Sequence, residues 1–391
     1  MKAMLTVLWK EVRENLRDKR TVFSALVYGP LIGPVLFVVL MNTMVGREMK
    51  KAEGPLKVPV IGAEYAPNLI GALKQQGLVP QPPIANPDKA VRERDTDVVL
   101  RIPASFGEAW TKGEPAQVEL IYDASQMGSS TPRERLEGML KQYSRQQGAL
   151  RLLARGLSPG IAAPVTVSKR DQSTPQSRAG LALGILPYFF VIAIYIGGMY
   201  LAIDLTAGER ERQSLEPLFA NPVARWRILV GKLGAIGAFS LASLVLTAVA
   251  FSIAGKFMPA EKLGMVFDLG PAFIAGAILL ELPLIALFAV LETLVAAFAK
   301  SYREAQTYLG LLMILPILPS LLMTFMPVKP AHWMYAVPLL GQQIGVSDLL
   351  RGTPVHPGDI GLALVCGFAV ALVLGVITAM VYRSERLAIS A

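Results

Sequence analysis

Residues 269–299 have the sequence LGPAFIAGAILLELPLIALFAVLETLVAAFA, and only Glu281 and Glu292 in this run carry a charge. A helix of about 20 predominantly apolar residues is long enough to cross the hydrocarbon core of a bilayer. This run therefore predicts a membrane-spanning helix with two carboxylates inside the membrane.

The same length criterion identifies five further spans. Their charge-free runs are residues 21–46, 179–203, 233–255, 305–328 and 360–382. The chain is 53% hydrophobic and only 17% charged, whereas soluble domains average about 25% charged residues. Because buried helices of soluble proteins rarely reach six such lengths in one chain, we predict an α-helical integral membrane protein with six transmembrane helices.

A polar stretch, residues 47–178, separates the first two spans and holds about half of all the charged residues. Alternating or apolar segments in it predict strands, and capped segments predict helices. Strands are predicted at residues 57–61, 97–102, 118–122 and 165–167, helices at 68–76 and 131–155, and a proline-rich loop at 80–87. We predict that the stretch is an inserted, extracytoplasmic α/β domain.

Lys and Arg are concentrated on one side of the predicted membrane. Fifteen lie in residues 1–20, the loops after spans two and four, and the tail 383–391, against four in the opposite short loops. Because cytoplasmic loops carry the excess of Lys and Arg, both termini are predicted to be cytoplasmic, in a bacterial cytoplasmic membrane. The net charge of +9 mostly reflects this topology, so we expect the lipid bilayer, and not nucleic acid, as its partner.

Two further segments are predicted to lie at the membrane surface. Residues 1–20 form an amphipathic cytoplasmic elbow helix. Its apolar stripe consists of Leu5, Leu8, Val12 and Leu16, with Trp9 beside it. Residues 329–359 are too short and too polar to span, which predicts an outer interfacial or re-entrant segment.

The cytoplasmic loop 204–232 is too patterned for a simple connection. Ser214 can cap a short helix that Pro222 ends. That helix would present an apolar knob made of Leu215, Leu218 and Phe219. A short helix that projects from the membrane suits docking into a cytoplasmic partner.

The sequence of this loop resembles the coupling-helix signature of type-2 ABC exporter permeases. The matching residues are ERERQSLEPL at 209–218, Asn221-Pro-Val and Gly231-Lys. Trp9-Lys-Glu with Arg17-Asp-Lys-Arg resembles the N-terminal elbow of the family, and residues 298–306 resemble its loop between the fourth and fifth helices. The large outer domain after the first span resembles the NatB-like sodium-efflux subgroup.

The resemblance implies a non-catalytic permease that works with a separate, NatA-like ATPase dimer. ATP and magnesium would bind to that partner, no cofactor would bind to this chain, and a second permease chain would complete a homodimer or heterodimer. The implied contacts with the ATPase are Glu209, Arg210, Glu211, Arg212, Ser214, Leu215, Glu216, Leu218, Phe219, Pro222, Ser301, Arg303 and Glu304. The chain lacks a phosphate-binding Gly-x-x-x-x-Gly-Lys-Ser/Thr motif, since Trp226 and Leu233 occupy its first and last positions around Gly231-Lys232.

Glu281 and Glu292 are the main candidates for a transport pathway. They are eleven residues apart, which returns a helix to within about 20° of the same face. Ionisable residues inside a membrane mark ion pathways, so Glu281 is a candidate Na⁺ contact; Glu292 could instead pair with Lys300 or Arg303. Kinks are predicted at the Gly-Pro pairs of the first span, which either line the pathway or serve packing alone. These pairs are Gly29-Pro30 and Gly33-Pro34.

The expected function is therefore ATP-driven efflux, with Na⁺ as the favoured substrate. Export of hydrophobic drugs, peptides or lipid-linked molecules is an alternative within transport. A membrane sensor or scaffold that transports nothing is the alternative from another class. With one cysteine, Cys366, and two histidines, the sequence excludes an internal disulfide and offers no firm metal site.

Overall fold

The computed structural model describes residues 2–125, 130–162, 165, 168, 170–214, 222–258, 260, 265–325 and 329–383. The chain divides into two compact units, of which the first contains residues 1–41 and 172–391 and the second residues 42–171.

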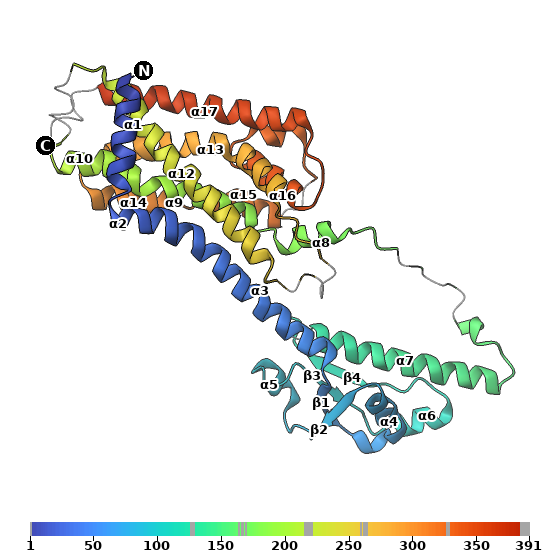
Figure 1. The fold of residues 1–391 in the computed structure, drawn as a ribbon. Coiled ribbons are helices and arrows are strands. Elements are labelled where there is room, and N and C mark those ends of the chain that lie inside the picture. Colours follow the sequence, from blue (N-terminus) through green and yellow to red (C-terminus); the bar gives the residue numbers. More distant parts are fainter. Residues whose placement is uncertain are drawn as a thin grey trace. The chain divides into compact units, whose positions relative to one another are not determined.

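Within the described residues, six helical segments are long and apolar enough to cross a membrane, which confirms the predicted number. They are Phe23–Arg47, Leu186–Glu211, Arg225–Gly255, Pro271–Phe298, Tyr302–Met323 and Pro357–Arg383. Their elements (Figure 1) are η1 (Phe23–Tyr28), α3 (Gly29–Glu53), α9 (Leu186–Ile203), η5 (Asp204–Gly208), α10 (Glu209–Glu211), α12 (Arg225–Gly255), α13 (Pro271–Phe298), α14 (Tyr302–Leu312), α15 (Ile317–Phe325) and α17 (Pro357–Arg383).

Helices α9, α12, α13 and α17 pack side by side in the first unit (Figure 1). Phe190 of α9 contacts the rings of Phe251 and Phe273 in the core. Gly197 permits close packing, because a Cβ atom there would lie 2.6 Å from the Cβ of Ser243 on α12. Most of α9 is buried, so its side chains face protein and not lipid.

The second and fifth spans depart from single regular helices. A short helix, α8 (Pro175–Ala182), precedes α9, and α9 starts at Leu186 with a proline in its first turn. The fifth span is interrupted between α14 and α15. There Gln343 Nε2 donates to the Pro316 carbonyl at 2.9 Å, and the Tyr195 hydroxyl donates to the Leu309 carbonyl at 2.6 Å. Side chains thus bond carbonyls next to the break, as a non-helical backbone inside a membrane requires.

The segment before the last span contains η7 (His332–Ala336) and α16 (Leu340–Leu350). Helix α16 is too short to cross a bilayer and packs against α13, where Gly345 contacts Leu280. In η7, burial and a 2.7 Å hydrogen bond to Asp348 raise the pKa of Tyr335. This segment is therefore anchored to the bundle.

The second unit is an α/β domain with a four-stranded sheet. The strand order is β2 (Leu78–Gln81), β1 (Leu56–Ile61), β3 (Val98–Arg101) and β4 (Glu119–Tyr122). Strand β1 pairs in parallel with β2, with Leu56 opposite Leu78, and in parallel with β3, with Val60 opposite Leu100. Strand β4 pairs antiparallel with β3.

Helices α4 (Pro67–Gln75), α6 (Phe106–Lys112) and α7 (Ser130–Ala154) supply apolar side chains to the core beneath the sheet, and α5 (Pro87–Arg92) packs against β3 and β4. Leu73 of α4, Phe106 of α6 and Leu136 of α7 are all buried in that core. The predicted strands at 57–61, 97–102 and 118–122 and helices at 68–76 and 131–155 are confirmed.

The predicted loop 80–87 is wrong at its start, because β2 continues to Gln81. Pro80 is compatible with this strand since β2 lies at the edge of the sheet, where a missing N–H breaks no ladder. The helices α5 and α6 were not predicted. The strand predicted at 165–167 lies mostly outside the described residues, which there include only Val165.

The predicted elbow contains α1 (Lys2–Asn15) and α2 (Lys19–Val22). Helix α1 packs against α12, since a Cβ on Gly231 or Gly234 would lie 2.7 Å from Val7 or Leu8 respectively. The predicted apolar stripe is divided: Leu8 faces α12, whereas Leu5 and Leu16 are exposed together with Trp9. Contact with protein on one side and exposed apolar groups on another suit a helix at a membrane surface.

Candidate coupling site and buried carboxylates

The second span stays helical past its last apolar residue, because its charged residues have partners. Both terminal nitrogens of Arg212 lie 3.0 Å from Asp204 Oδ1. The backbone N–H and the hydroxyl of Ser214 both donate to the Glu209 carbonyl, at 2.9 and 3.1 Å, after which the helix ends. The sequence instead predicts that the span ends before Asp204.

Glu209 points into the bundle and forms an ion pair with Lys232 of α12. Lys232 is only 1% exposed and Glu209 8% exposed. Lys232 Nζ also donates to the Leu205 carbonyl at 2.8 Å, so one ammonium group ties η5 and α10 to α12. Glu209 is therefore a positioning residue in this conformation rather than an exposed contact.

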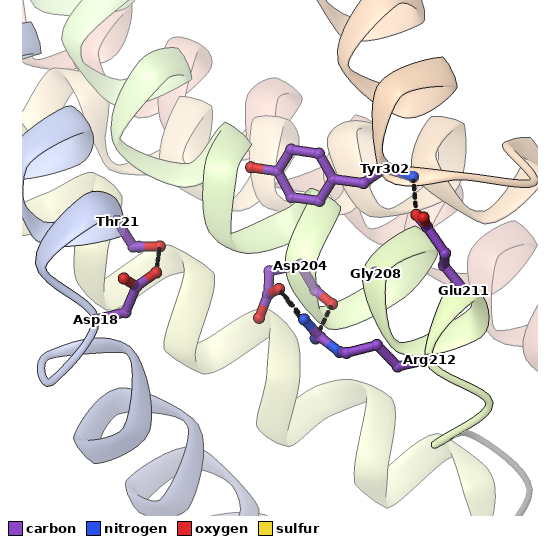
Figure 2. Close-up of a pocket in the computed structure, with 7 residues that line it drawn as sticks. All are labelled: Asp18, Thr21, Asp204, Gly208, Glu211, Arg212 and Tyr302. Carbon is purple, nitrogen blue, oxygen red and sulfur yellow. Dashed lines mark hydrogen bonds and ion pairs between the residues drawn. The ribbon is translucent and has the colours of Figure 1, made fainter.

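A cavity of about 430 Å³ is lined by residues from three parts of the chain (Figure 2). Its lining residues are Asp18, Thr21, Asp204, Gly208, Glu211, Arg212 and Tyr302. The Thr21 hydroxyl donates to Asp18 at 2.7 Å, and the Tyr302 backbone N–H donates to Glu211 Oε2 at 2.8 Å. The elbow, the C-terminal end of the second span and the start of α14 thus meet at one polar site, the Asp204 pocket.

The loop before α14 is organised by Ser301 and Glu304. Ser301 Oγ accepts a hydrogen bond from the Glu304 N–H at 3.3 Å and caps α14. Glu304 Oε2 accepts from the Lys300 N–H at 2.6 Å. Arg210 Nη1 donates to the Ala299 carbonyl at 3.4 Å and so links α10 to this loop. It adds to the bond between Glu211 of α10 and the Tyr302 N–H at the start of α14.

The structure therefore brings together the two stretches that the resemblance implies as coupling elements. In the first stretch, Glu209 bonds to α12, Arg210 to the loop before α14, and Glu211 to the first residue of α14. Arg212 pairs with Asp204 at the end of the second span. Arg303 lies in the first turn of α14, and Pro222 precedes α12. The predicted knob and Glu216 fall within residues 215–221, outside the described residues.

Glu281 and Glu292 of α13 are both completely buried. Neither carboxylate has a hydrogen-bond partner in the described part of the chain. The alternative in which Glu292 pairs with Lys300 or Arg303 is therefore wrong. Since an unpaired anion is costly inside a membrane, both residues remain candidates for a functional role.

The Gly-Pro pairs of the first span lie against α9. A Cβ atom on Gly33 would lie 2.8 Å from Phe189, and one on Gly29 would lie 3.3 Å from Ile196. Pro34 lies inside α3 and Pro30 in its first turn. The contacts of Gly29 and Gly33 favour the packing interpretation of the two Gly-Pro pairs.

Sequence reasoning missed the burial and ion pair of Lys232, as well as two buried polar residues, Glu11 and Ser240. Lys232 lies two turns inside α12, a position that counting charges between spans cannot distinguish from a loop. Buried Glu11 shares a stripe of four-residue spacing with Val7 and Asn15, so helical periodicity could have revealed it. Ser240 gives no signal within an apolar run.

Comparison of the sequence with known proteins identifies a matching family and a similar protein. A family model described as ABC-2 family transporter protein matches residues 29–380, from the start of α3 into α17. The chain is 28% identical over 314 residues to the ABC transporter permease protein NatB of Bacillus subtilis (strain 168). That similarity covers 79% of this chain and 80% of the relative.

Proposed function

Because the chain belongs to the ABC-2 family of transporter proteins, we propose that it is the permease subunit through which a separate ATPase drives the export of a monovalent cation, with Na⁺ favoured. The observation that carries the coupling part of this proposal is the bonded network around the Asp204 pocket. It joins the inner end of the second span to α12 and α14, next to residues 215–221.

The network suggests how movement would enter the membrane. ATP-driven closure of the ATPase dimer would push on residues 209–222 and 300–306. Because Glu209 is bonded to Lys232 and Glu211 to the backbone of Tyr302, a displacement of α10 would move α12 and α14 with it. Such a push shifts the transport equilibrium only if these contacts differ between the inward-open and outward-open states.

The cation substrate is supported by Glu281 and Glu292, which are buried and unpaired in the described part of the bundle. Oxygen ligands suit hard cations, and intramembrane carboxylates mark ion pathways. The resemblance to the sodium-efflux subgroup favours Na⁺ among them.

The distribution of Lys and Arg supports the setting. We place both termini and the 204–232 loop in the cytoplasm of a bacterium, with the second unit outside. The assembly would contain an ATPase dimer and a second permease chain, identical or homologous, and this chain would supply no catalytic group.

Export of an apolar compound is the second candidate, and a groove in the second unit favours it. The groove has a volume of about 580 Å³, and its lining includes Phe106, Trp110 and Tyr143. These rings stack in series, with centroids 5.7 and 5.8 Å apart. An aromatic groove of this kind would suit a drug, a peptide or a lipid-linked molecule. A sensor or scaffold, the third candidate, would need no ATPase.

The test is to purify the tagged chain from membranes of its native host and to measure ATPase activity with sodium chloride or choline chloride. An ATPase that co-purifies and is stimulated by sodium would support cation export. Stimulation by apolar compounds alone would favour the second candidate. Absence of any ATPase would refute the transporter function.

A further inference from the structure

Helices α9, α12 and α13 pack against one another (Figure 1). Gly198 of α9 faces both of the other two helices. A Cβ atom at this position would lie 2.6 Å from Ser240 Oγ on α12 and 2.8 Å from Glu292 Oε2 on α13. The two oxygens are therefore no more than about 5.4 Å apart, a gap that one ion or water molecule bridges. Only glycine leaves both oxygens room beside α9.

Both polar groups are completely buried, and neither has a hydrogen-bond partner among the residues that the structure describes. Their polar neighbours differ in this respect. Ser243, one turn along α12, donates to the Ala193 carbonyl at 2.8 Å, and Thr293, next to Glu292, donates to the Ala289 carbonyl at 2.7 Å. Ser240 and Glu292 thus keep unused hydrogen-bonding capacity beside Gly198, whereas these two polar neighbours do not.

A carboxylate enclosed in this way is costly as a bare anion. A proton or a cation removes that cost, and a cation would gain the Ser240 hydroxyl as a second oxygen ligand. Among the described residues, no group of three or more Asp, Glu, His or Cys side chains could hold a metal ion. A single carboxylate with a hydroxyl suits a weakly held monovalent ion better than Ca²⁺, which takes six to eight oxygen ligands.

We propose that Glu292 and Ser240 form a binding site for one monovalent cation at Gly198, between α9, α12 and α13. The site rests on the proposed function and names the position at which the exported ion is held. It also links the ion to the coupling network, because α12 carries Lys232 and Ser240 two turns apart on the same helix.

The experiment uses the complete complex with its ATPase, reconstituted in liposomes, and measures ATPase activity against sodium concentration with choline as the replacement cation. Glu292→Gln removes the negative charge of the site, and Ser240→Ala removes its hydroxyl ligand; both keep the side-chain volume similar. We expect each to raise the apparent KM for sodium roughly tenfold or more. Ser243→Ala is the matched control, because its hydroxyl already bonds to backbone, and should leave this KM unchanged.

A binding measurement without turnover provides the second readout. Sodium chloride should raise the melting temperature of the wild-type permease in detergent relative to choline chloride, and Glu292→Gln should abolish that difference. Gly198→Ala, whose methyl group would crowd both oxygens, should do the same, whereas Gly375→Ala should not, because its nearest neighbour would lie 3.9 Å away.

The experiments distinguish failure of the Glu292–Ser240 site from failure of the proposed cation export. Sodium-stimulated activity that Glu292→Gln and Ser240→Ala leave unchanged would overturn this site and leave cation export standing. An equal loss in Ser243→Ala would also overturn it, since packing alone would then explain the effect. A wild-type complex that does not respond to sodium would overturn cation export and, with it, this site.

Discussion

Lys232 connects the second and third spans through two bonds made by one side chain. Its ammonium group has been taken out of water, and the Glu209 carboxylate and the Leu205 carbonyl compensate for that loss. Removing one partner of a buried ion pair leaves an uncompensated charge and is usually worse than removing both. The pair therefore makes the relative position of α10 and α12 sensitive to either residue.

The first prediction compares the loss of one partner of the Lys232–Glu209 ion pair with the loss of both. Lys232→Met leaves Glu209 buried without its cation and should destabilise the permease by about 3–5 kcal/mol. The double variant Lys232→Met with Glu209→Gln should recover part of that loss, because it removes the uncompensated charge. Melting of the purified permease in detergent measures both. A double variant as unstable as Lys232→Met would contradict a buried pair.

At the scale of elements, the structure shows which parts of the fold a sequence can predict. Charge-free runs locate the six spans because bilayer thickness is a strong constraint on length. They fail at the C-terminal end of the second span, where Asp204 pairs with Arg212 two turns later and Glu209 pairs with Lys232 of α12. The proximity of Ser240 and Glu292 to Gly198 was equally unpredictable, because it arises only where three helices meet.

A second prediction concerns the stretch between α10 and α12. Replacing Leu215, Leu218 and Phe219 by alanine removes the apolar knob that the proposed function docks into the ATPase. Since each such side chain contributes about 1.5–3 kcal/mol when fully buried, ATPase recovery with the tagged permease should fall at least roughly tenfold. The control replaces Leu311, Ile314 and Leu318, which are exposed apolar residues of the fifth span. Equal recovery in both variants would refute the docking role.

A third prediction tests the cap of α14. Ser301→Ala removes the acceptor of the Glu304 N–H and should cost about 1 kcal/mol of helix stability. The residue after Ser301, Tyr302, donates its backbone N–H to Glu211, so a loosened cap should weaken the link between α14 and α10. We therefore expect fewer sodium ions exported per ATP hydrolysed. Ser301→Asp, which keeps an N-cap acceptor, should restore the wild-type ratio in vesicle transport assays. Thr307→Ala is the control, because the Thr307 hydroxyl bonds only to the Arg303 carbonyl of the same helix among the bonds described.

At the scale of the whole molecule, the proposed arrangement in the membrane depends on two independent features. The excess of Lys and Arg favours both termini inside, and the even number of spans found in the described residues would put them on the same side. In this proposed arrangement the second unit, inserted after the first span, would lie outside, and its groove would be accessible from there.

The last prediction tests this topology with the chain's only cysteine removed. In a Cys366→Ser background, Ser158→Cys places a thiol on an exposed position of the second unit, and Arg13→Cys places one on an exposed position of α1. A membrane-impermeant maleimide should label the first variant in intact cells and the second only after the cells are disrupted, because the bilayer excludes the charged reagent. Labelling of Arg13→Cys but not Ser158→Cys in intact cells would invert the topology. It would also place the 204–232 loop, and with it the Asp204 pocket, beyond the reach of a cytoplasmic ATPase.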